Sequence, residues 1–265
     1  MTNDGSITVE KSSTITTITF NRPSKLNALT AEMSRDLLAA LDTLDGDEDT
    51  AVAVLTGAGR AFCVGGDLAL EESFNAHTFR RELEMFADTV MAILSCSKPI
   101  ICQMNGHAVG WGATMALFCD VIIASETARI GDPHVNIGLS TGDGASVIWP
   151  QLIGYPRAKQ MLLTGELMEA QQAERWGLVN EICAPNQLER RVREIAERIA
   201  AKPRHAVAMT KASVNIGLKQ VVRSAMDGYI TYECSTQQHP DHLVAVRRFM
   251  DAQYQRSDGR NKAKK

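Results

Sequence analysis

The stretch "KPIICQMNGHAVGWGATMALFCDVIIAS", residues Lys98 to Ser125, contains the pattern that decides the fold. Pro99 opens an apolar run that ends in glycine at Gly106, and this predicts a short buried strand. A glycine-broken helical segment follows, and "DVIIAS" (Asp120–Ser125) supplies a second apolar run. Two buried strands joined through a helix are typical of a parallel sheet that helices cover on both faces.

The residues before this stretch repeat the same alternation. "TITTITF" (Thr14–Phe20) has the period of two that indicates a strand, and "AVAVLTG" (Ala51–Gly57) is a short apolar run ending in glycine. Apolar residues recur at helical spacing over 31–44 and over about 78–94. We therefore expect an α/β chain with a mostly parallel sheet.

The pattern changes from about Arg157 onward, where no strand candidate of appreciable length remains. Pro203 and Gly217 separate the helical segments. The expected helices span 170–176, 188–200, 204–216, 218–238 and 241–254. We predict a core domain over residues 1–200 and a helical C-terminal region over 201–265. Such a region cannot close much core alone, so we expect it to pack on the sheet or on neighbouring subunits.

Length and composition favour one main domain, because 265 residues with 45% apolar content can bury one sizeable core. The net charge is only −3, and the one dense basic run, "GRNKAKK", is at the chain end, Gly259–Lys265. Its position favours a solvated tail rather than a nucleic-acid surface. No apolar window has the length of a membrane span.

Six cysteines without a CxxC pair predict reduced thiols and no structural zinc. "HPDH" (His239–His242) indicates a helix start rather than metal ligands. We expect a soluble, cytoplasmic protein without a membrane partner.

Two glycine-rich loops follow predicted strands. The first, "TGAGRAFCVGGDL" (Thr56–Leu68), has neither the GxGxxG spacing of dinucleotide sites nor the GK[ST] of a P-loop. The second, "NGHAVGWGATMALFCD" (Asn105–Asp120), runs into a helix, so its backbone N–H groups near 110–112 lie at a helix N-terminus. Such groups are oriented donors for a negatively charged oxygen. The alternative for either loop alone is a tight turn with close backbone packing.

Taken together, these loops resemble the enoyl-CoA hydratase/isomerase, or crotonase, superfamily. The resemblance extends along essentially the whole chain and includes "NRPSKLNALT" (Asn21–Thr30) and "LTGELMEAQQAERWGLVNEI" (Leu163–Ile182). It implies a crotonase-like (ClpP/crotonase) spiral of ββα units with a helical C-terminal region, assembled as homotrimers or dimers of trimers. It also implies an acyl-CoA substrate, with CoA present as part of the thioester and no separate cofactor.

The resemblance assigns roles to particular residues. Members of the superfamily stabilise an enolate-like oxyanion with two backbone N–H groups, and the matching positions are Gly66 and Trp111. Relatives usually carry glycine where this chain has Trp111, so its ring must occupy space near the acyl group. The positions that match CoA-contacting segments are Leu26, Ala28, Val64, Asp67 and Leu68.

The chain departs from the hydratases of this superfamily at two positions. Those enzymes add water with two glutamates, whereas the matching positions here read Thr114 and His134. Threonine cannot act as a base near neutral pH, but histidine titrates in the useful range. The β-diketone hydrolases of the superfamily look similar at "GDPHVNIGLSTGDG", where a His and an Asp work as a pair. The resemblance therefore suggests that Asp143 orients His134 for proton transfer.

Other interpretations of these residues and of the chain remain open. Asp143 alone fits a helix cap, and His134 alone fits a hydrogen-bonded core histidine. Glu233 lies on a predicted long helix that could approach a neighbour's site, and it is left out of the predicted site. The leading hypothesis is an acyl-CoA enzyme of the hydratase/isomerase type. The alternatives are a retro-Claisen β-diketone hydrolase that uses no CoA and a catalytically weak acyl-CoA-binding homologue.

Overall fold

The larger of two β-sheets forms the middle of the molecule. The computed structural model describes residues 6–68 and 75–262. The sheet has the order β1-β2-β3-β5-β7-β10, and all neighbours except β1 and β2 are parallel. Its strands span Ser6–Ser12 (β1), Ile15–Asn21 (β2), Val52–Gly57 (β3), Ile100–Met104 (β5), Val121–Ser125 (β7) and Glu181–Cys183 (β10). Every residue of β3 is buried, as expected for a strand covered on both faces.

A smaller sheet carries the turns that border the site. Its order is β4-β6-β8-β9, with parallel pairing from β4 to β8 and an antiparallel pair between β8 and β9. The strands span Ala61–Cys63 (β4), His107–Val109 (β6), Arg129–Gly131 (β8) and Leu167–Glu169 (β9). The segments that follow β4, β6 and β8 therefore leave the same edge of this sheet side by side.

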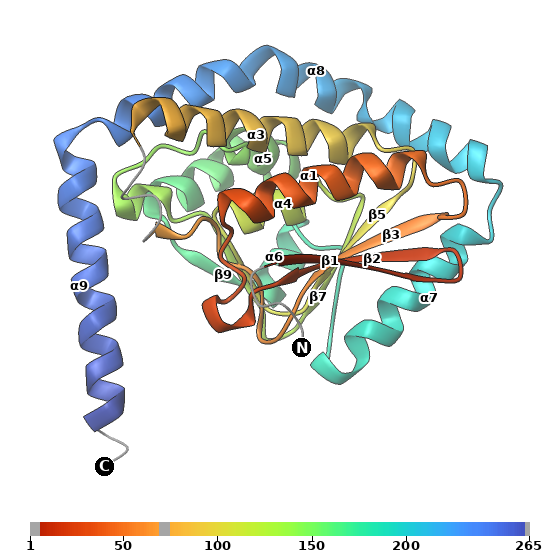
Figure 1. Ribbon diagram of the computed structural model, residues 1–265, viewed down its shortest axis with the longest axis horizontal. Coiled ribbons are helices and arrows are strands. Elements are labelled where there is room, and N and C mark those ends of the chain that lie inside the picture. Colours follow the sequence, from red (N-terminus) through yellow and green to blue (C-terminus); the bar gives the residue numbers. More distant parts are fainter. Residues whose placement is uncertain (1–5, 69–74, 263–265) are drawn as a thin grey trace.

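Helices cover both faces of the larger sheet (Figure 1). They span Ala31–Gly46 (α1), Ala76–Ser95 (α3), Trp111–Phe118 (α4), Ala145–Thr164 (α5), Ala170–Trp176 (α6), Leu188–Ala200 (α7), Arg204–Gln237 (α8) and Pro240–Lys262 (α9). Single 3-10 turns lie at Pro23–Lys25 (η1), His134–Ile137 (η2) and Pro185–Gln187 (η3). The main core packs α1, α3, α4 and α5 against one face, while a smaller cluster packs α7 against the other. The strand and helix pattern predicted for the first half is confirmed.

One expectation for the C-terminal third was wrong. Gly217 does not separate two helices, because α8 continues through it. A glycine inside a helix costs only about 1 kcal/mol, and the burial of Val222, Met226 and Ile230 on the same helix outweighs that cost. The strands β9 and β10 lie in the same region, where the sequence offered no strand candidate of appreciable length. Each has three residues, which is too few to show a period of two.

The C-terminal helices pack on the sheet domain through α8. This helix lies along α3 and also contacts α5, and its buried side chains belong to the main core. Figure 1 shows α9 leaving the end of α8 and running away from the sheets. The division at residue 200 stays a prediction, although the two parts share one core. The end of the basic run, 263–265, lies outside the described residues, and none of the described helices is long and apolar enough to cross a membrane.

Candidate active site

The predicted site residues gather around one cavity of about 550 Å³. It opens where the segments after β4, β6 and β8 meet, and α3 and α9 also contribute to its wall. The predicted residues that line it are Leu26, Ala28, Val64, Gly66, Asp67, Leu68, Trp111 and His134. Asp143 does not line the cavity and is buried, with 1% of its surface exposed.

The backbone N–H of Gly66 points away from Leu29, the residue with which Gly66 forms a β-bridge. Leu29 and Gly66 form an isolated parallel bridge, in which the Leu29 N–H donates to the Gly65 carbonyl (2.8 Å) and the Asp67 N–H donates to the Leu29 carbonyl (3.0 Å). In a parallel bridge the residue between these two bonds turns its own N–H to the opposite side. The Gly66 N–H is therefore directed away from Leu29.

Trp111 is the first residue of α4, where backbone N–H groups have no partner inside the helix. The chain enters the helix through Gly110, whose φ of +56° favours glycine. Close packing brings this turn against the first loop: a Cβ on Gly112 would lie 2.1 Å from the Cys63 carbonyl oxygen, and one on Gly65 would lie 3.7 Å from the Trp111 nitrogen. The helix start and the Gly65–Gly66 turn thus form one side of the cavity together.

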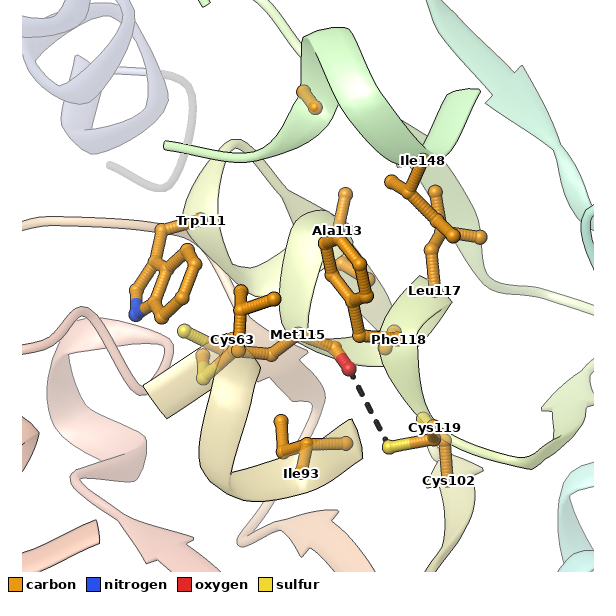
Figure 2. Packing of buried hydrophobic residues seen from close by; sticks show 14 of the residues in the cluster. Cys63, Ile93, Cys102, Trp111, Ala113, Met115, Leu117, Phe118, Cys119 and Ile148 are labelled. Carbon is orange, nitrogen blue, oxygen red and sulfur yellow. Dashed lines mark hydrogen bonds between the residues drawn. The ribbon is translucent and has the colours of Figure 1, made fainter. Parts of the chain in front are cut away.

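The indole ring of Trp111 packs inward rather than standing free in the cavity. Only 2% of this residue is exposed, and its ring stacks on Phe86 of α3 with centroids 4.3 Å apart and planes 15° apart. Figure 2 shows Trp111 at one margin of the buried cluster around α4, near Cys63. Trp111 therefore combines a backbone donor with an aromatic wall.

An ion pair holds the two predicted CoA-contacting segments together. Arg22 donates to the Asp67 carboxylate (2.7 Å) and to the Ala28 carbonyl (3.0 Å). Asn27, which is fully buried, donates from its side chain to the Ala61 and Phe62 carbonyls. These bonds fix the 22–28 loop against the first glycine loop, so that both line one end of the cavity.

His134 begins η2 and bonds to a carboxylate other than the predicted one. Its Nδ1 forms a short hydrogen bond with Oδ1 of Asp132, which is fully buried. The other ring nitrogen, Nε2, lies 3.7 Å from Oε1 of Glu233. The prediction that Asp143 is the direct partner of His134 is thus replaced, because Asp132, two residues earlier in the same loop, reaches Nδ1 first.

Asp143 is bonded to the start of α5 and to Thr114, not to His134. Its Oδ1 accepts the backbone N–H of Ala145 at the start of α5 (3.0 Å), and its Oδ2 accepts the hydroxyl of Thr114 (3.1 Å). Asp143 therefore satisfies one backbone donor at the start of α5 from the position before the cap residue, Gly144. Its carboxylate also acts on the imidazole of His134 through space.

Glu233 of α8 is the residue that sequence reasoning left out. It is 2% exposed, and its Oε2 accepts the Gly142 N–H at 2.6 Å across 91 residues of sequence. The long helix thus brings Glu233 to the site of its own chain. No local motif marks this position, so only the packing of α8 reveals it.

The buried charges shift one another's protonation. Burial disfavours the charged form of His134, but the carboxylates of Asp132, Asp143 and Glu233 outweigh this and raise its pKa well above the ordinary value. Burial and the negative charge of Asp132 raise the pKa of Asp143 to about 6, although His134 opposes the change. Burial raises the pKa of Glu233 to about 8, again against the effect of His134. The cluster therefore retains protons near neutral pH and can exchange them.

The raised pKa of Glu233 predicts a pH-dependent stability. The folded chain keeps this proton to about pH 8, whereas the unfolded chain releases it near the ordinary value of 4.5. Its contribution to stability is therefore full below pH 4.5 and falls as pH rises toward 8. Glu233→Gln removes the ionisation, so its melting temperature should exceed that of the wild type increasingly from pH 5 to pH 9. The difference at pH 9 corresponds to a few kcal/mol, about 1.4 kcal/mol per pKa unit before coupling to His134 reduces it.

Calorimetry at pH 5, 7 and 9 tests this expectation. Glu48→Gln is the matched control, because Glu48 is an exposed glutamate in the turn after α1. Parallel curves of melting temperature against pH for the wild type and Glu233→Gln would show that Glu233 does not take up its proton on folding.

Asp132, His134 and Asp143 also place donor atoms within 4.8 Å of one another, a spacing at which a cation can be held. Carboxylate and imidazole donors suit several divalent metals. The Asp132–His134 bond and the two bonds accepted by Asp143 already engage several of these donors. We interpret the group as a cluster that shares protons, and the absence of a metal stays a prediction.

Comparison with known proteins places this geometry in a family. The sequence profile described as "Enoyl-CoA hydratase/isomerase" matches residues 10–255. The chain belongs to the enoyl-CoA hydratase/isomerase family. It is 37% identical over 211 residues to a "Probable enoyl-CoA hydratase" of Rhizobium meliloti, covering 80% of this chain and 81% of that protein.

Other members of the enoyl-CoA hydratase/isomerase family carry different names. A "4-chlorobenzoyl coenzyme A dehalogenase-2" of Arthrobacter sp is 31% identical over 89% of this chain and 87% of its own length. The crystal structure of an enoyl-CoA hydratase/isomerase from Mycobacterium paratuberculosis superposes with a TM-score of 0.87, at 31% identity, over 94% of this chain and all of that chain. The predicted crotonase-like fold is confirmed. The names of the relatives support an acyl-CoA-processing enzyme, but they differ in reaction.

Proposed function

We propose that the protein is an acyl-CoA enzyme that stabilises an enolate oxygen with the backbone N–H groups of Gly66 and Trp111. The observation that carries this proposal is the joint position of these groups at one cavity that also contains the His134 imidazole. An N–H at a helix start is a fixed dipole, and fixed donors stabilise developing negative charge without reorganisation. A thioester carbonyl between the two donors would become more acidic at its α-carbon.

Charge along the cavity suits a CoA thioester. Lys25 and Arg60, both exposed, line the cavity near the 22–28 loop, and their cationic groups can bind phosphate. Leu26, Ala28, Val64, Asp67 and Leu68 surround the same end. CoA then enters as part of the substrate, with no separate cofactor.

His134 carries the proton transfer in this proposal. Its imidazolium delivers a proton to the enolate carbon, and its neutral form removes one from the α-carbon or from water. The carboxylates of Asp132 and Asp143 stabilise the imidazolium, while Glu233 near Nε2 takes up or returns a proton. His134 and Thr114 then stand where hydratases of the family use two glutamates, and Asp143 and Glu233 supply carboxylates from other segments.

A second candidate is hydrolysis of a β-diketone by carbon–carbon bond cleavage. The buried histidine with carboxylates on both ring nitrogens favours this candidate, since such a group can activate water. The two N–H donors would bind the enolate that leaves when the bond breaks. This reaction needs no CoA.

Turnover and binding separate the candidates. We expect the wild type to turn over crotonyl-CoA and to gain about 2.7 kcal/mol of stability at an acyl-CoA concentration one hundred times its Kd. Cleavage of a cyclic β-diketone without any stabilisation by acyl-CoA would replace the first proposal with the second. Stabilisation by acyl-CoA without turnover of any substrate would identify a binding homologue instead.

We also propose a homotrimer or dimer of trimers located in the cytoplasm. Met209, Val214 and Ile216 expose apolar surface on α8, which favours contact between subunits. The six cysteines are free and mostly buried, as expected in a reducing compartment. Light scattering of the purified chain measures the oligomer mass, and a monomer at micromolar concentration would contradict this assembly.

A further inference from the structure

The cavity wall combines cationic and apolar side chains. The cationic side chains Lys25 and Arg60 lie at one end, near the 22–28 loop. Three apolar side chains of α3, Phe79, Leu83 and Phe86, form another part of the wall. Glu82 of the same helix also lines the cavity, and its carboxyl group accepts the Ser34 hydroxyl. A CoA thioester bound with its phosphates at the cationic end would direct its acyl group toward α3.

Trp111 lies at the apolar part of the wall, because its ring stacks on Phe86. The same residue supplies the proposed oxyanion donor from its backbone. Its ring and the N–H that would bind the thioester carbonyl therefore belong to the same residue. Trp111 is 2% exposed and Leu83 is 2% exposed, so both are packed closely against their neighbours. The indole fills space that an acyl chain running toward α3 would otherwise enter.

We propose that the Trp111–Phe86 stack limits the acyl group to a short one and is the length-determining element of this site. This inference rests on the proposed acyl-CoA function. Because the donor is a backbone group, the side chain of Trp111 can be changed while the N–H at that position is kept. Length selection and oxyanion stabilisation are therefore separable by mutation at one residue.

Removing the indole should leave a void that is continuous with the cavity. An acyl chain can fill this void, and each methylene that becomes buried raises affinity about fourfold. For Trp111→Ala we therefore expect octanoyl-CoA to bind at least about tenfold more tightly than butanoyl-CoA. For the wild type we expect no gain in affinity over the same lengthening.

The experiment measures dissociation constants of butanoyl-, octanoyl- and dodecanoyl-CoA by calorimetry, so it does not depend on the reaction. The ratio of kcat/KM for 2-octenoyl-CoA to crotonyl-CoA is the second measurement and should rise at least tenfold in the variant. If Trp111→Ala does not fold, Trp111→Leu and Phe86→Leu replace it, and each should raise both ratios in the same direction by a smaller factor.

Trp149→Leu is the matched control for a loosened core. Trp149 is fully buried on α5 and does not line the cavity, so its loss should leave the chain-length profile unchanged. The inference would be overturned if the wild type, Trp111→Leu and Phe86→Leu all bound acyl-CoA with the same dependence of affinity on chain length. Failure of the wild type to bind any CoA thioester would instead overturn the proposed function on which the inference rests.

Discussion

Replacing His134 with glutamine is expected to lower kcat by about 10²- to 10⁴-fold, the usual contribution of a positioned general acid or base. The glutamine amide can still donate to Asp132, which keeps the loop in place. It cannot gain or lose a proton at Nε2 beside Glu233. The Kd of an acyl-CoA ligand should change little, since the proposed oxyanion donors are backbone groups of other residues. Steady-state kinetics together with calorimetric binding measure the two quantities separately.

His205→Gln is the control for this substitution, because His205 is exposed at the start of α8 and lies outside the cavity. It should retain wild-type kinetics. A His134→Gln variant with the kcat and the pH profile of the wild type would show that the proton transfer belongs to another residue.

Gly112→Ala is expected to destabilise the fold and to impair the site at the same time. The new Cβ would lie 2.1 Å from the backbone oxygen of Cys63, so α4 must move away from β4. Overpacking of this kind costs about 1–3 kcal/mol, which corresponds to a fall of roughly 2–12 °C in Tm for a chain of this size. The shift carries the Trp111 N–H with it, and a displacement of about 1 Å at a reacting centre can cost 10²-fold in rate.

Gly217→Ala is the control for Gly112→Ala, because it makes the same substitution at a position with room for a side chain. No atom lies within 4 Å of a Cβ at this helical position, so the change should raise stability by about 0.5–1 kcal/mol. Thermal melting and kcat of the two variants provide the comparison. Equal Tm values for Gly112→Ala and the wild type would mean that α4 and β4 are packed loosely enough to accept the extra methyl group.

The parts of the site that the sequence predicted are those encoded in contiguous segments. The strand, glycine turn and helix of residues 98–125 specify both the parallel sheet and the place of the Trp111 N–H at a helix start. Gly66 lies in the corresponding turn after β4. The spacing of glycines within one loop is enough to place such backbone groups, so the cavity residues could be named before any coordinates.

The acid–base half of the site was less accessible to sequence reasoning. Asp132 stands only two residues before His134, but spacing in an irregular turn does not say which carboxylate reaches Nδ1. Asp143 seemed the better partner because of the resemblance to hydrolases of the superfamily. Glu233 has no sequence signal at all, since its place depends on how α8 packs across α3 and α5. Long-range contacts of this kind follow from the register of a helix, which no local motif fixes.

The contact between Glu233 and Gly142 affects the order in which the parts of the site assemble during synthesis. The two residues are 91 positions apart, and at 5–20 residues per second the ribosome needs roughly 5–18 s to synthesise the intervening chain. During that time the nascent loop with Asp132, His134 and Asp143 has no α8 to cover it. The loop therefore meets solvent, and any chaperone at the tunnel exit, as an open and charged surface. The buried cluster of Asp132, His134, Asp143 and Glu233 can be complete only after Glu233 has left the ribosome.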